Sequence, residues 1–165
     1  AGRPGYVSRL GASQKYLEKK TVITSGTMVA TKRFSEIGAC REDYFIDSID
    51  HEYCLRARSY GYKVLLSMPV TMRHHLGEER NPSRLFKSFP EHPPFRKYYI
   101  MRNAVETIKT YWWKEPLWCV KQSFRIVAEV ACIIFIEGGK MGKIRAVLKG
   151  LKYGVKGQMQ PWKPQ

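Results

Sequence analysis

The fold is decided by residues 43 to 64, which have the sequence DYFIDSIDHEYCLRARSYGYKV. Ile49, Tyr53 and the turn that contains Leu55 recur at helical spacing, so this stretch predicts a helix over 47–60. Gly61 follows directly, and a glycine in that position is typical of a helix C-terminus. The run YKVLLSM at 62–68 then predicts a strand. The stretch therefore indicates a helix followed by a strand in a domain of mixed α/β character.

Three carboxylates, Asp47, Asp50 and Glu52, fall within six residues at the start of the predicted helix. A helix N-terminus favours negative charge, so one interpretation is that Asp47 and Asp50 only complement the helix dipole. The other interpretation is that a carboxylate held there beside a cleft acts as a general base toward a hydroxyl group. Asp50 lies one turn before Cys54, but the pattern alone leaves both interpretations open.

The rest of the chain changes character along its length. Before the deciding stretch, we expect an irregular loop over 1–20, strand segments at 21–24 and 28–30, and a short helix within 32–37. After it, we expect an extended segment at 70–75, a loop over 78–94, helices over 95–111, 116–136 and 140–155, and a frayed tail over 157–165. The order predicts an α/β part over 1–111 and a basic helical tail over 112–165.

Two neighbouring histidines, His74 and His75, follow the extended segment and precede Gly77. Adjacent residues of a strand point to opposite faces, so at most one of them enters a given site. A lone histidine is commonly structural. A neutral imidazole at a strand end could also complete an octahedral Mn²⁺ or Mg²⁺ site beside carboxylates and phosphates.

The amino-acid composition limits the classes of molecule that the protein is expected to bind. The chain of 165 residues carries 29 Lys+Arg against 14 Asp+Glu, a formal charge of +15, which favours a polyanionic partner such as a phosphate-bearing substrate, an anionic membrane or a nucleic acid. No recognised nucleic-acid motif is present, so we do not expect nucleic acid as a partner. The four cysteines show no CxxC spacing, which disfavours a zinc ribbon, and we expect them to be reduced.

Four sequence blocks occur in an order that resembles a known family. They are SGTMVATKRFSEIG at 25–38, the deciding stretch at 43–64, MRHHLG at 72–77 and RKYYIMRN at 96–103. Together they resemble the second half of a family 2 glycosyltransferase with a GT-A fold, the fold of nucleotide-diphospho-sugar transferases, and most closely its rhamnosyltransferase branch. The resemblance covers about residues 21–111 and implies the C-terminal portion of a GT-A domain, followed by amphipathic helices.

The resemblance also implies roles for individual residues. Asp50 matches the catalytic base, and Asp47 matches an aspartate that accompanies it in the rhamnosyltransferase branch. Polar positions of the same helix match Glu52 and Arg56, the segment Ser25, Gly26 and Thr27 matches a loop near the acceptor, and His74 matches a metal or diphosphate contact. The run Ala39 to Glu42 departs from the family pattern, and no Asp-x-Asp motif is present.

The activity that the resemblance implies is transfer of a sugar, with rhamnose as the candidate, from a nucleotide-diphosphate donor to a glycan or lipid-linked acceptor. The transfer inverts the anomeric centre and uses Mg²⁺ or Mn²⁺. Because the nucleotide-binding half has no counterpart here, we expect the chain to be a fragment that is inactive alone. The parent enzyme is expected at the cytoplasmic face of the cell membrane.

The tail offers a second kind of function. Lys121, Arg125 and Glu129 interrupt the apolar stretch 117–136, which predicts an amphipathic helix and no spanning helix. Trp112 and Trp113 precede it and a basic helix follows, a combination typical of docking on an anionic membrane surface. Packing of these helices on the protein's own core is the alternative. The alternative to the enzyme is a non-catalytic basic module that is membrane-associated or binds nucleic acid. In the membrane-associated case Asp47, Asp50 and His74 only cap and pack.

Overall fold

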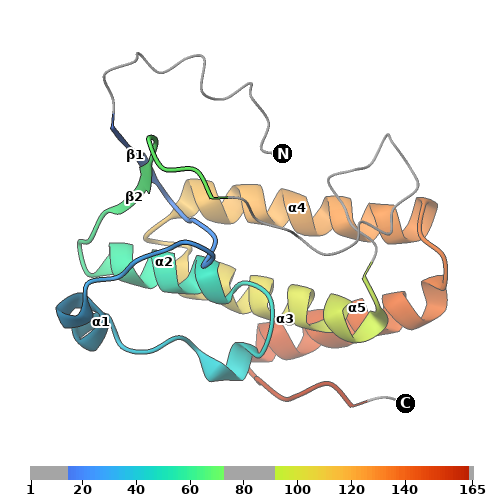
Figure 1. The fold of residues 1–165 in the computed structure, drawn as a ribbon. Coiled ribbons are helices and arrows are strands. Elements are labelled where there is room, and N and C mark those ends of the chain that lie inside the picture. The colour runs from blue at the N-terminus through green and yellow to red at the C-terminus, as the bar shows by residue number, and fades with distance from the viewer. Residues whose placement is uncertain (1–14, 73–91, 164–165) are drawn as a thin grey trace.

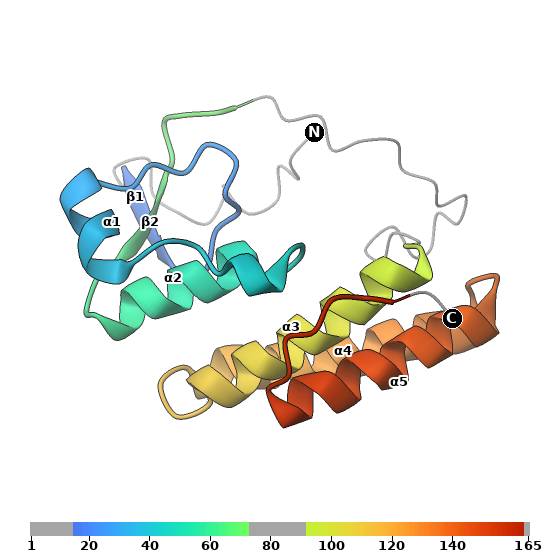
Figure 2. The same cartoon turned by 90° about the horizontal axis from the view of Figure 1, so that it is seen from below.

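The computed structural model describes residues 15–72 and 92–163. Two groups of elements face each other (Figure 1). One contains strand β1 (Tyr16–Lys19), helix α1 (Thr31–Ile37), the 3₁₀ turn η2 (Glu42–Tyr44), helix α2 (Ile49–Ser59) and strand β2 (Val64–Ser67). The other contains the helices α3 (Pro94–Tyr111), α4 (Pro116–Phe135) and α5 (Lys140–Lys156). Seen from below in Figure 2, α2 lies across from α3.

The two strands form an antiparallel pair with Tyr16 opposite Ser67 and Lys19 opposite Val64. Strand β2 and helix α2 confirm the helix and strand predicted from the deciding stretch. Gly61 has φ +85°, the left-handed conformation that ends the helix and turns the chain toward β2. The described part of the chain is mostly helical, and its sheet has 2 strands, so the larger GT-A sheet stays a prediction.

Helices α3 and α5 approach each other unusually closely because α5 presents glycines at the contact. A Cβ atom on Gly150 would lie 2.5 Å from the Tyr98 carbonyl oxygen, and one on Gly154 would lie 2.7 Å from the Arg102 carbonyl oxygen. Helix α4 joins this pair through a cluster of Met101, Ile133 and Val147. The three helices therefore share one core, and the expected boundary at 111/112 falls within it.

Helix α4 begins at Pro116, a residue suited to the first helical turn because its missing N–H group would be unpaired there. None of the helices in the described ranges combines the length and the apolar character that a segment crossing a bilayer needs. The predicted helices over 95–111, 116–136 and 140–155 are confirmed to within two residues. All four cysteines are free thiols, as expected.

Three sequence expectations were wrong. The β-branched segments 21–24 and 28–30 form no strand, because the chain turns sharply at Gly26 and has no paired neighbour there. Strand β1 lies instead inside the expected loop over 1–20, where β2 supplies its partner. The tail is not frayed as far as Lys163, since the Trp162 N–H donates to the Tyr99 hydroxyl at 3.0 Å.

Candidate functional site

A cavity of about 630 Å³ lies between the loop after β1, helix α2 and strand β2. The predicted acceptor-loop residues Ser25, Gly26 and Thr27 all line it. Cys54 and Tyr53 line it from α2. The structure thus brings the predicted loop against the helix that carries the predicted base.

The loop wall is shaped by a tight turn. The Thr27 N–H donates to the Thr24 carbonyl at 2.9 Å, and the Thr27 hydroxyl donates to the Ile23 carbonyl at 2.6 Å. Gly26 has φ +75°, and a Cβ atom there would lie 3.2 Å from the Met72 side chain. The backbone conformation therefore favours glycine, and the Met72 side chain would have to shift by a few tenths of an ångström to admit a Cβ atom.

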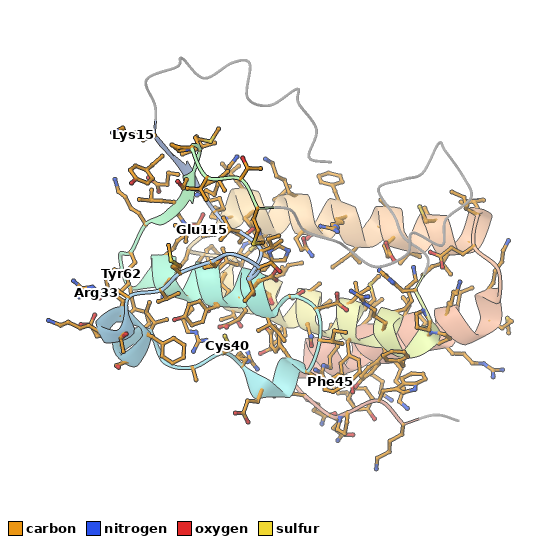
Figure 3. The ribbon with its side chains drawn as sticks, in the orientation of Figure 1. Lys15, Arg33, Cys40, Phe45, Tyr62 and Glu115 are labelled. Atoms are coloured by element: carbon orange, nitrogen blue, oxygen red, sulfur yellow. The ribbon has the colours of Figure 1, made fainter. Side chains whose placement is uncertain are left out.

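A polar pair closes the cavity near α1. Arg33 and Tyr62 both line it, and Figure 3 shows the two side chains together beside α1. The Arg33 guanidinium donates to the Tyr62 hydroxyl at 3.3 Å and lies over its ring, with 5.2 Å between the guanidinium carbon and the ring centroid. The Glu36 carboxylate accepts hydrogen bonds from both side chains, so the polar group beside the largely apolar cavity is an ion pair with a bonded hydroxyl.

Asp50 lies in the first turn of α2 and is half-buried. Its Oδ1 accepts the N–H of His51 at 2.9 Å. Asp50 does not itself line the cavity, but Cys54, one turn further along the same face, does. Burial raises the pKa of the Cys54 thiol, and the negative charge of Asp50 adds to this. Asp50 is therefore close to the cavity wall and at the end of α2 where its charge is stabilised.

The backbone that leads into Asp50 is strained. Phe45, Asp47 and Ser48 have φ of 62°, 64° and 63°, in the left-handed region that side chains other than glycine rarely adopt. Such conformations persist where surrounding contacts impose them, and they concentrate at functional sites. Here the strain falls on the residues just before α2, which set the position of Asp50.

Helix α3 supplies the contacts that hold this segment. The Asn103 amide donates to the carbonyls of Tyr44, Ile46 and Asp47 at 2.8–2.9 Å. The buried Arg102 guanidinium donates to the Asp43 carbonyl at 2.6 Å. Two adjacent side chains of one helix therefore satisfy most of the carbonyl groups of the strained segment.

Asp47 is held by a two-pronged ion pair. Its two carboxylate oxygens accept the Arg96 Nε and Nη2 groups at 3.0 and 3.1 Å. This bidentate geometry fixes the orientation of both partners. Asp47 is thus occupied by α3, and its predicted role toward substrate stays a prediction.

Glu52 and Arg56 form a buried network away from the cavity lining. Glu52 is 3% exposed, and its carboxylate accepts the Tyr111 hydroxyl at 2.8 Å and the Arg56 guanidinium at 3.1 Å. Arg56 also donates to the Ala39 carbonyl at 2.8 Å. Burial and the nearby Glu52 carboxylate raise the pKa of Tyr111. These contacts tie α2 to α3 and to the loop after α1, and substrate binding by this pair stays a prediction.

The metal site cannot be built from the described residues. In the ranges 15–72 and 92–163, no three His, Cys, Asp or Glu side chains gather closely enough to hold a metal ion. His74, the predicted metal contact, lies outside the described residues. The donor set that the structure describes therefore does not fit Mg²⁺ or Mn²⁺ on its own.

Sequence reasoning missed the roles of Arg96, Arg102 and Asn103. All three belong to the block RKYYIMRN, which contributed to the resemblance but predicted no contact. A buried Arg-Asn pair in an amphipathic helix was the available signal, because buried polar side chains need partners.

Comparison with known proteins gives one informative match. The chain is 36% identical over 91 residues to the dTDP-rhamnosyl transferase RfbF of Shigella flexneri. The match covers 55% of this chain and 30% of that relative, so the chain spans well under two thirds of the relative's length. No family model matches the chain, and no solved structure matches it.

The match supports a coarse relationship. Over the matched part, the chain is related to a glycosyltransferase, and specifically to a protein named as a rhamnosyl transferase. The expected relationship to rhamnosyltransferases is confirmed at this level. Membership of family 2 and the GT-A fold stay predictions.

Proposed function

We propose that this chain is the acceptor-side part of a family 2 glycosyltransferase with a GT-A fold, which transfers a rhamnosyl group from a dTDP-linked donor to a glycan or lipid-linked acceptor. The sequence match to a dTDP-rhamnosyl transferase supports the donor class. The observation that carries the proposal is the position of Asp50, at the start of α2, behind a strained segment and beside the cavity lined by the loop 25–27.

In the proposed reaction the acceptor hydroxyl attacks the anomeric carbon of the donor sugar from the side opposite the nucleotide. The new bond joins the acceptor oxygen to the anomeric carbon, and the bond from that carbon to the diphosphate oxygen breaks. The Asp50 carboxylate takes the hydroxyl proton, and the nucleoside diphosphate leaves with the bonding electrons. One displacement of this kind inverts the anomeric configuration.

The described residues assist by fixing geometry. The Asn103 and Arg102 contacts hold the strained segment, so Asp50 enters the reaction without a large rearrangement of its backbone. The cavity beside Cys54 and the loop 25–27 gives the acceptor a place next to α2. We also propose a divalent cation, with His74 as one of its ligands.

The test replaces Asp50 with asparagine in the complete transferase. Asp50→Asn preserves shape and removes the base, so turnover of dTDP-rhamnose should fall by about 100-fold or more while donor affinity is unchanged. Turnover is measured as release of dTDP, and donor affinity by calorimetry.

Asp43→Asn is the matched control. Asp43 is an exposed carboxylate that pairs with Arg41, and the same chemical change there should leave turnover within about twofold of the unmodified protein. Near-normal turnover in Asp50→Asn would remove Asp50 as the base. It would favour the alternative in which the carboxylates only cap and pack.

A further inference from the structure

Helix α4 presents an apolar row on the side away from the core. Its residues recur every three or four positions, with one gap of seven, and each is at least 40% exposed. They are Leu117, Val120, Phe124, Val127 and Ile134. The opposite side of the same helix carries Cys119, which is buried against α2 and α3, and Ile133, which is buried against α3 and α5. Helix α4 is therefore apolar on two sides, and only one of them is used by the core.

Helix α5 repeats the arrangement. Met141, Leu148 and Val155 are separated by seven residues each and are 67%, 61% and 65% exposed. The helix packs against α4 through Val147, which shares a cluster with Ile133. Two neighbouring helices thus each carry an exposed apolar row, and a row of this length is more than scattered surface hydrophobic residues.

The charges around these rows have one sign. Between residues 116 and 163, the exposed charged side chains are all basic. They are Lys121, Arg125, Lys140, Arg145, Lys152, Lys156 and Lys163. The acidic residues of this span, Glu129 and Glu137, are 8% and 7% exposed and both pair with the buried Lys97.

The turn before α4 adds an exposed indole. Trp113 is 91% exposed in the segment between α3 and α4. Indole side chains are favoured at the boundary between lipid headgroups and acyl chains, where one part of the ring is apolar and the N–H group meets water. Trp113 precedes Leu117, the first exposed apolar residue of α4, by four positions in the sequence.

We propose that the outer face of α4 and α5, defined by these two apolar rows and the basic residues beside them, docks on an anionic lipid surface. The apolar rows would enter the headgroup region while the lysine and arginine side chains meet lipid phosphates. A second copy of the chain fits this face less well, because packing two copies together would bring like charges into contact. The proposal uses residues outside the cavity and is independent of the proposed reaction.

The test measures co-sedimentation of the full chain with vesicles of phosphatidylcholine alone or mixed with phosphatidylglycerol. Binding should be strong only with the anionic lipid. Lys121→Gln with Arg125→Gln should weaken it about 30-fold, because each basic residue near an anionic surface contributes a factor of about five. Lys32→Gln with Lys63→Gln removes the same charge from exposed positions outside the helical group and should weaken binding at most about twofold.

A second pair of variants tests the contribution of the apolar rows to vesicle binding. Leu117→Ser with Phe124→Ser should reduce binding by about tenfold or more, whereas Tyr60→Ser, at a side chain 59% exposed at the end of α2, should not. Circular dichroism and the midpoint of thermal unfolding establish that each variant is folded. If the double variant fails to fold, quenching of Trp113 fluorescence by brominated anionic lipid, lost in Trp113→Phe, supplies the same information.

Three results would overturn the proposal. The first is equal, negligible binding to both vesicle types. The second is equal weakening by the charge variants on α4 and by their matched controls, which would reduce the effect to net charge. The third is a dimer in sedimentation velocity without lipid that Leu117→Ser with Phe124→Ser dissociates, which would assign the face to a second copy.

Discussion

Asn103 concentrates several contacts in one side chain. Its amide is buried in α3 and donates to three carbonyls of the segment before α2, where three non-glycine residues have positive φ. Without those donors the carbonyls of Ile46 and Asp47 would lose this partner, whereas the Tyr44 carbonyl would keep the bonds from the Ile46 N–H and the Arg102 guanidinium. The backbone would lose contacts that impose its conformation.

We therefore expect Asn103→Ala to lower the free energy of unfolding by about 2 kcal/mol. In the complete transferase it should also lower turnover more than donor affinity, since it acts on the position of Asp50. Urea unfolding gives the first quantity and steady-state kinetics the second. Thr110→Ala is the control, because Thr110 is exposed and its hydroxyl donates to the Glu106 carbonyl within the same helix. Unchanged kinetics in folded Asn103→Ala would show that the segment keeps its shape without this amide.

For single residues, the sequence correctly predicted that Asp50 lies at the start of a helix. The apolar spacing and Gly61 that carried this prediction lie within the helix or directly after it. The positive φ values before it could not be predicted. They are imposed by Asn103, which is 56 to 59 residues away in the chain. The ion pair between Asp47 and Arg96 could not be predicted for the same reason, because the two residues are far apart in the sequence.

At the scale of the elements, the contact between α3 and α5 depends on the missing side chains of Gly150 and Gly154. A methyl group at either position would meet backbone oxygen atoms of α3, which cannot move aside as a flexible side chain would. Gly150→Ala and Gly154→Ala should therefore each destabilise the fold by about 2 kcal/mol, the usual range for overpacking.

Gly142→Ala is the matched change in the same helix. A Cβ atom there would lie 3.6 Å from the Pro94 side chain, an ordinary contact. Alanine should stabilise the protein by about 0.5 to 1 kcal/mol, because it favours the helix more than glycine does. Chemical denaturation of the three variants measures the contrast. Equal effects at all three positions would show that helix propensity, and not the close approach, governs α5.

The helices could be predicted closely because their periodicity is contained within each element. Strand β1 could not, because its four residues YLEK have no distinctive alternation and gain their structure from pairing with Val64–Ser67. The segment 21–24 had the better strand composition and no such partner. Pairing across the chain overrides β-propensity in this way.

For the whole molecule, Glu115 joins the two groups of elements. It lies between α3 and α4, and Figure 3 shows it in the region between these helices and the strands. Its carboxylate accepts the Arg58 Nε group of α2 at 2.6 Å and pairs with Lys20 after β1. Although burial opposes the charged form, the bonds from Lys20 and Arg58 keep the pKa of Glu115 below its ordinary value of 4.5.

This lowered pKa predicts a pH dependence of stability. A carboxyl whose pKa is lower in the folded state stabilises the fold above its unfolded pKa, and the contribution is lost as pH falls through the folded value. Glu115→Gln should therefore be less stable than the unmodified chain at pH 7, and the difference should shrink below pH 4.5. Urea unfolding across that range measures it. A difference that stays constant down to pH 3 would show that the ion pair is not its source.

The division of the chain at 111/112, which was drawn from the sequence, stays a prediction. What composition could not predict is that α3, on the near side of the boundary, packs with α4 and α5 while it also holds the segment before α2. Helix α3 takes part in both sets of contacts, and this arrangement exists only once the chain has folded.

The docked tail has a consequence for handling the protein. Arg102 donates to the Asp43 carbonyl and also to the Gln160 carbonyl at 2.5 Å, so one guanidinium joins the segment before α2 to residues close to the end of the sequence. Truncation after Gly157 would remove Gln160 and with it a contact of the guanidinium that holds the candidate catalytic segment.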